Sequence, residues 1–115
     1  IMDAYNANPT SMRLALSEFE KSGVQDGLLI LGDMLELGRY SIDLHREIFE
    51  LVKKTGYPAV IVGPVFSQVA ESKGAIAFED VEAAAAYFEA NPVSGKTVLI
   101  KGSRGIGVDR LLTYL

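Results

Sequence analysis

Two continuous apolar runs limit the folds that this 115-residue chain can adopt. Residues 28–31 and 98–100 contain only leucine, isoleucine and valine, without the alternation of apolar and polar side chains that marks a strand with one exposed face. Such runs are typical of strands buried on both faces of a parallel sheet. The chain is therefore expected to build its core around a sheet that is covered on both sides.

Helical patterns alternate with the strand-like segments along the whole chain. Strands are predicted at residues 1–5, 27–32, 59–63, 75–78 and 97–101. Apolar residues at helical spacing occur within residues 12–19, 44–52, 66–70, 81–88 and 108–115. Asn8, Ser41 and Asp80 are the predicted N-caps, and Gly23 and Gly56 follow the first two helices. Strict alternation with short connections predicts an α/β fold, a Rossmann-like doubly wound and mostly parallel sheet flanked by helices.

The composition is that of a single folded domain. Hydrophobic residues make up 49% and charged residues 23% of the chain, and the net charge of −4 argues against a nucleic-acid partner. No apolar run approaches the ~18 residues of a membrane span, and the chain has no cysteine for disulfides or thiolate metal sites. We expect a monomeric, cytoplasmic protein without a membrane partner. Because the chain opens directly on a strand, we also expect residues 1–115 to be one domain of a larger protein.

Ligands of doubly wound folds bind beyond the carboxyl ends of the strands. Three segments at that edge concentrate the polar residues, namely 5–11, 32–39 and 101–105. The last is basic and rich in glycine, so its N–H groups, with Lys101 and Arg104, could hold a carboxylate or a phosphate. An anionic ligand is therefore the predicted guest.

Structural roles are open for the same residues. Asn8 could serve only as a helix cap, Asp33 could stabilise its own loop, and Lys101 and Arg104 could form a solvated basic edge. A lone histidine such as His45 is more often structural than a ligand. The chain contains no phosphate-binding loop of the G-x-x-x-x-G-K-[ST] type and no dinucleotide fingerprint after its first strand, and no metal site is predicted.

Three motifs resemble one known family. The motifs occur in this order: Asp-Ala-Tyr-Asn-Ala-Asn-Pro at 3–9, Leu-Gly-Asp-Met-Leu-Glu-Leu-Gly at 31–38 with Leu-His-Arg-Glu at 44–47, and Lys-Gly-Ser-Arg at 101–104. Together they resemble the C-terminal domain of Mur ligases. Within that family they are most similar to the branch that adds D-Ala-D-Ala to UDP-N-acetylmuramoyl tripeptide in peptidoglycan precursor synthesis.

The resemblance implies an ATP-dependent amide ligation. In the parent enzyme the tripeptide carboxylate would be activated as an acyl phosphate, and the amine of D-Ala-D-Ala would attack it. ATP and Mg²⁺ would be held mainly by a central ATPase domain in the same polypeptide, outside the present chain. The isolated domain is therefore predicted to be inactive, with no catalytic residue of its own.

The resemblance also assigns roles to individual positions. The residues expected to contact the nucleotide are Asp3, Asn6 and Asn8. The residues expected to bind D-Ala-D-Ala are Asp33, Lys101, Ser103 and Arg104. His45, which follows the second motif, is a candidate supporting residue.

Two other classes share the alternating pattern. A receiver-like signalling domain would need an acidic pair after the first strand, where this chain has Asn6 and Asn8. It would also need an acceptor aspartate after the third strand, where this chain has Gly63 and Pro64. A free-standing nucleotide-binding module would need the missing fingerprint. Both alternatives predict chemistry different from that of a ligase domain.

Overall fold

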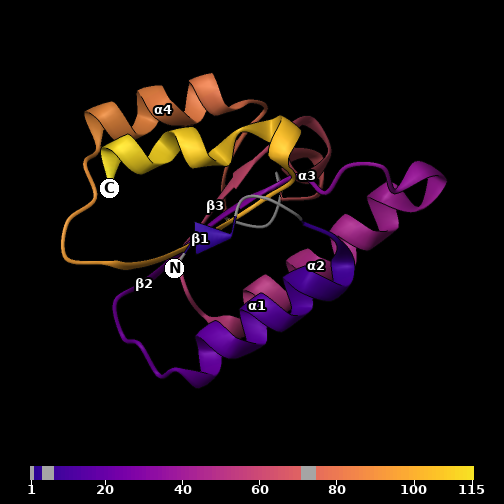
Figure 1. The fold of residues 1–115 in the computed structure, drawn as a ribbon, viewed down its shortest axis with the longest axis horizontal. Coiled ribbons are helices and arrows are strands. Elements are labelled where there is room, and N and C mark those ends of the chain that lie inside the picture. The colour runs from indigo at the N-terminus through magenta and orange to yellow at the C-terminus, as the bar shows by residue number, and fades with distance from the viewer. Residues whose placement is uncertain (1, 4–6, 71–74) are drawn as a thin grey trace.

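The computed structural model describes residues 2–3, 7–70 and 75–115, with side chains described from residue 7 onward. A five-stranded sheet runs through it in the order β1-β5-β2-β3-β4, and every neighbouring pair is parallel (Figure 1). The strands are β1 (Met2–Asp3), β2 (Gly27–Gly32), β3 (Ala59–Val62), β4 (Ile76–Phe78) and β5 (Thr97–Lys101). This confirms the doubly wound α/β prediction; residues 1, 4 and 5 of the first predicted strand lie outside the described residues.

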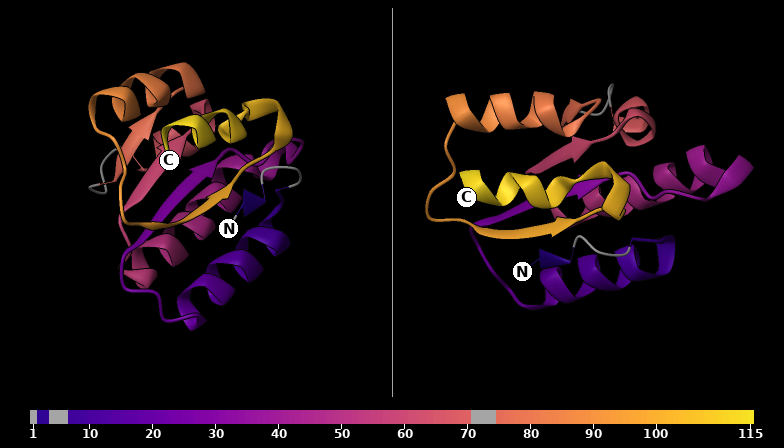
Figure 2. Two further views of the ribbon diagram at one scale, coloured as in Figure 1. Left: turned by 60° about the vertical axis from the view of Figure 1, so that its left-hand side comes forward. Right: turned by 45° about the horizontal axis from the view of Figure 1, so that its top comes forward.

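Helices cover both faces of the sheet (Figure 2). On one face lie α1 (Pro9–Lys21), α2 (Ser41–Thr55) and α3 (Pro64–Ala70), and on the other lie α4 (Val81–Ala90) and the 3₁₀ helix η3 (Val108–Tyr114). Alternate residues of β2 enter the two cores: Leu29 and Leu31 pack with the first group of helices, and Leu28 and Ile30 with the second. The continuous apolar run is thus explained by burial on both faces, as predicted.

The start of α1 follows its sequence closely. Asn8 Oδ1 accepts a hydrogen bond from Ser11 N–H at 2.8 Å, and Asn8 N–H donates to Ser11 Oγ at 3.1 Å. This reciprocal capping box satisfies N–H groups that the first helical turn leaves without partners. The predicted N-cap role of Asn8 is confirmed.

The start of α2 differs from the prediction. A short 3₁₀ helix, η1 (Gly38–Tyr40), leads directly into it, so Tyr40 occupies the N-cap position and Ser41 is the first helical residue. Ser41 N–H donates to the carbonyl of Gly38, and no side-chain cap is formed. The preceding 3₁₀ turn therefore supplies the partner that a capping side chain would otherwise provide.

The last helix also differs. The predicted stripe of residues 108, 111, 112 and 115 assumed α-helical spacing, but the segment is a 3₁₀ helix. With three residues per turn, Val108 and Leu111 align and are fully buried, while Leu112 is rotated outward and is 45% exposed. None of the helices in the described ranges is long and apolar enough to cross a membrane.

The connections after β2 and β5 diverge at the centre of the sheet. The chain leaves β2 for α2 on one face, and it leaves the adjacent β5 for η3 on the other. Gly32, the last residue of β2, and Gly102, the first residue after β5, approach closely: a Cβ added at Gly102 would lie 2.9 Å from the Cα of Gly32. Such a topological switch point is where open α/β sheets bind their ligands.

Candidate functional site

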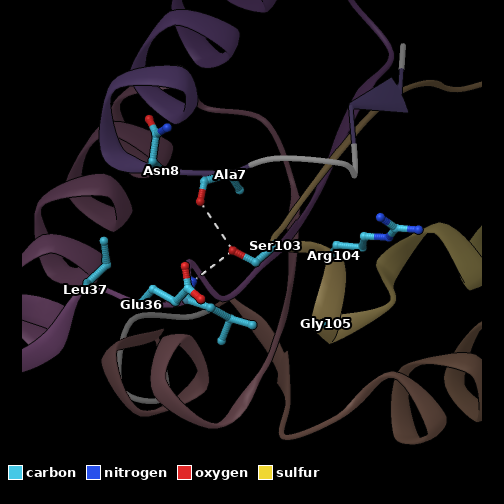
Figure 3. Close-up of a pocket in the computed structure, with 8 residues that line it drawn as sticks. Ala7, Asn8, Glu36, Leu37, Ser103, Arg104 and Gly105 are labelled. Carbon is cyan, nitrogen blue, oxygen red and sulfur yellow. Dashed lines mark hydrogen bonds between the residues drawn. The ribbon is translucent and has the colours of Figure 1, made fainter.

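A crevice of about 450 Å³ opens at this switch point (Figure 3). It is lined by residues 7–8 before α1, 35–37 after β2 and 103–105 after β5. These are parts of the three segments selected from the sequence. The volume is within the range of small-molecule sites.

Ser103 connects the three segments. Its N–H donates to the carbonyl of Asp33 at 2.9 Å, and its Oγ accepts from Leu35 N–H at 2.8 Å. The same hydroxyl donates to the carbonyl of Ala7 at 3.3 Å (Figure 3). Ser103 is only 9% exposed, and its proton is used within the fold, so what remains for a ligand is acceptor capacity on Oγ.

Asp33 lies behind the crevice. Its Oδ1 accepts from Phe66 N–H at 2.7 Å and its Oδ2 from Val65 N–H at 3.0 Å, so the carboxylate caps α3. A Cβ at Gly63 would overlap this carboxylate, and the φ of +130° at Gly63 also favours glycine. Asp33 is 1% exposed and does not line the crevice, so the sequence-based expectation of a direct contact between Asp33 and the dipeptide does not fit this arrangement.

His45 supports the loop after β2 through a hydrogen bond to the backbone of that loop. Its Nε2 accepts from Met34 N–H at 2.9 Å, and its Nδ1 lies 2.7 Å from the carbonyl of Ser41. These partners require the tautomer with the proton on Nδ1, which leaves Nε2 as an acceptor. The ring is fully buried edge-on against Phe66, and Nε2 is 3.9 Å from Asp33 Oδ1. These are the contacts of a supporting residue.

The two basic candidates occupy different environments. Lys101 is 1% exposed within β5, where it is in register with Leu31 of β2 and Asp3 of β1, and it does not line the crevice. Arg104 lines the crevice and is exposed. In Figure 3 the Arg104 side chain extends away from Ser103. The structure therefore brings Arg104, but not Lys101, to the lining of the crevice.

The candidates near the N-terminus are described only in part. Asn8 lines the crevice while its Oδ1 caps α1. The backbone of Asp3 pairs with β5, and Asn6 lies outside the described residues. In the described ranges no three histidine, aspartate or glutamate side chains gather in a way that could hold a metal ion.

Glu36 lines the crevice and was not selected from the sequence. It lies in the same acidic, glycine-bounded loop as Asp33, the acid that the resemblance assigns to the dipeptide. Among the described residues other than glycine, Glu36 alone has a positive φ, of 63°. A sequence does not display such a conformation, because only glycine and, less often, asparagine signal it.

Fold and site together define a parallel α/β domain with a crevice where connections diverge at the centre of its sheet. Residues 1–104 match the family model described as "Mur ligase, glutamate ligase domain". The chain belongs to the Mur ligase family. This confirms the resemblance and leaves no support for the receiver-like or free-standing nucleotide-binding alternatives.

Relatives indicate a branch of the family. The UDP-N-acetylmuramoyl-tripeptide–D-alanyl-D-alanine ligase of Treponema pallidum (strain Nichols) is 33% identical over 119 residues, which cover 96% of this chain and 26% of the relative. A crystal structure of MurF from Acinetobacter baumannii is 27% identical, with a TM-score of 0.80 over 96% of this chain and 26% of that one. The fold is also shared with MurF ligase from Thermotoga maritima in complex with ADP, which is 24% identical with a TM-score of 0.77 over 97% of this chain and 26% of that one. The chain thus spans about a quarter of the length of these proteins.

Proposed function

We propose that this chain is the acceptor-binding domain of a cytoplasmic, monomeric, ATP-dependent ligase that adds D-Ala-D-Ala to UDP-N-acetylmuramoyl tripeptide during peptidoglycan precursor synthesis. The observation that carries the proposal is the crevice formed by the three family motifs around Ser103. The names of the relatives supply the substrate class.

The reaction divides between this chain and the remainder of the enzyme. ATP, with Mg²⁺ and a central domain outside this chain, would convert the tripeptide carboxylate into an acyl phosphate. After its ammonium has lost a proton to solvent, the neutral amine of D-Ala-D-Ala would attack that carbon. The new C–N bond forms, the C–O bond to phosphate breaks, and the nitrogen loses a second proton to solvent to give the amide. The role of the present residues is to hold the dipeptide so that its amine faces the activated carbon, which lowers the entropic barrier of the step.

Arg104 is the proposed partner of the dipeptide carboxylate. A guanidinium offers a planar pair of N–H donors that matches a carboxylate, and Arg104 lines the crevice. Ser103 fixes the loops around the ligand, and Asp33, His45 and Lys101 act from within the fold, where they are buried. On the nucleotide side, Asp3, Asn6 and Asn8 remain the proposed contacts, with Asp3 accepting from the ribose hydroxyls.

The test is an assay of the full-length protein that contains this chain. Product formation should require ATP, UDP-N-acetylmuramoyl tripeptide and D-Ala-D-Ala together, as followed by phosphate release and mass spectrometry. Arg104→Ala should raise the KM for the dipeptide roughly ten- to hundredfold, because a charge-assisted hydrogen bond contributes ~1.5–3 kcal/mol.

Arg46→Ala is the matched control, because Arg46 is an exposed arginine paired with Asp43 on α2, outside the crevice lining. It should leave the dipeptide KM unchanged. Absence of product from the wild-type protein would contradict the proposed function. Turnover of ATP by the isolated chain would contradict the proposal that ATP is held mainly by a domain outside this chain.

A further inference from the structure

The crevice needs an acid for the amine end of its ligand, and Asp33 is not available for that role. A dipeptide with free ends is a zwitterion, so a site that binds it well must match an ammonium as well as a carboxylate. Both Asp33 oxygens accept backbone N–H groups of α3, and the side chain is fully enclosed. Among the described residues that line the crevice, the acid is Glu36.

The backbone around Glu36 is held in place from two sides. Met34 N–H is bound to His45 Nε2 at 2.9 Å, and Leu35 N–H is bound to Ser103 Oγ at 2.8 Å. Glu36 follows these two anchors with a φ of 63°, a conformation that is unfavourable for a residue with a Cβ. Residues held in such conformations cluster at functional sites, where the surrounding structure over-determines them.

The carboxylate of Glu36 is free to receive a ligand. Glu36 is exposed, and in the part of the chain that the structure describes its side chain makes no hydrogen bond or ion pair. In Figure 3, Glu36 and the side chain of Arg104 lie on opposite sides of Ser103. The described lining of the crevice thus contains one acidic residue, Glu36, and one basic residue, Arg104.

We propose that Glu36 binds the ammonium end of a zwitterionic acceptor whose carboxylate lies at Arg104. This inference rests on the proposed function and deepens it, because it names the residue that selects a free amine. Opposite charges at the two ends also fix the direction in which the dipeptide lies. An N-acylated dipeptide has no ammonium and loses the contact with Glu36.

The test compares two isosteric changes in the full-length ligase. Glu36→Gln removes the charge and keeps the shape, and Glu89→Gln does the same at an exposed position on α4, outside the crevice. Glu36→Gln should raise the KM for D-Ala-D-Ala roughly tenfold, as expected for loss of one charge-assisted hydrogen bond, and Glu89→Gln should not. Equal dipeptide KM values for the two variants would overturn the inference.

A competitive inhibitor separates the amine from the rest of the ligand. N-acetyl-D-Ala-D-Ala keeps the carboxylate but carries no ammonium, so its inhibition constant should be the same for wild type and Glu36→Gln. An inhibition constant that rises with the KM would show that Glu36 acts on the shape of the crevice, which also overturns the inference. A wild-type protein that forms no product would instead reject the proposed function, so the two failures are distinguishable.

Discussion

The two faces of the sheet are stabilised by different means. On the face covered by α1, α2 and α3, aromatic side chains pack beside the buried polar pair Asp33 and His45. The core under α4 and η3 is formed by apolar residues such as Phe88 and Val108, and an ion pair between Arg110 and Glu82 joins these two helices on the surface. Asp33 and His45 thus bond to backbone groups near the loop after β2, which is one of the three segments that line the crevice.

The two faces differ in how closely they fix the direction of individual backbone groups. Apolar packing is non-directional and tolerates adjustment, whereas a buried hydrogen bond fixes the direction of a particular N–H group. His45 orients a backbone N–H group in the loop after β2, and Asp33 orients two N–H groups at the start of α3. The apolar residues packed under α4 and η3 support the same sheet, and none of them lines the crevice.

The largest expected effect is on the apolar face. Phe88 is 2% exposed, and Phe88→Ala should lower the free energy of unfolding by about 3–5 kcal/mol through lost burial and a cavity. Urea unfolding measures this loss, with the exposed neighbour Glu89→Ala as control. The dipeptide KM of the full-length variant should stay at the wild-type value. An increase would show that the apolar face also affects dipeptide binding, which would contradict the difference between the two faces.

On the polar face, Asp33→Ala should lower the free energy of unfolding by about 2–4 kcal/mol, because the buried N–H of Phe66 and the partly buried N–H of Val65 lose their acceptor. Asp80→Ala is the matched control, since Asp80 caps α4 through a single exposed bond to Ala83 N–H and should cost about 1 kcal/mol. Unlike Phe88→Ala, Asp33→Ala should also raise the dipeptide KM. Equal losses of stability for the two aspartates would show that burial of the cap does not matter.

The smallest effect belongs to the exposed pair on the apolar face. The hydrogen bond from Arg110, at 3.0 Å, is the main cause that holds the pKa of Glu82 below its usual 4.5. A lowered pKa stabilises the fold at pH values above 4.5, and this contribution is lost as the pH falls through the pKa of the folded state. Arg110→Ala should therefore lower the melting temperature slightly at pH 7, and the difference from wild type should shrink in acid. A difference that grows in acid would contradict this assignment.

Local sequence signals predicted the framework, and long-range contacts decided the site. Continuous apolar runs and helix caps such as Asn8 reflect interactions within a few residues, and they gave the sheet and most helices correctly. The 3₁₀ spacing of η3 was missed because periods of 3.0 and 3.6 residues hardly differ over two turns. The position of Asp33 was missed because its partners lie more than 30 residues away along the chain.

Glu36 shows a further limit. The motif that contains it was recognised, but a motif does not tell which of two acids in one loop faces the ligand. Asp33 continues directly from β2 and remains in the core, while the left-handed turn at Glu36 carries the next acid outward. The choice between them depends on backbone conformation, which the identity of a glutamate does not reveal.

The insertion of β5 between β1 and β2 has a consequence for the order in which the molecule folds. Among the described residues β1 pairs only with β5, and one edge of β2 also pairs with β5. During synthesis β1 therefore lacks its partner strand until residue 101 has left the ribosome. The hydrogen bond from the Ser103 hydroxyl to the Ala7 carbonyl likewise closes a loop of almost the whole chain. The complete lining of the crevice is thus absent from every nascent fragment that ends before residue 103.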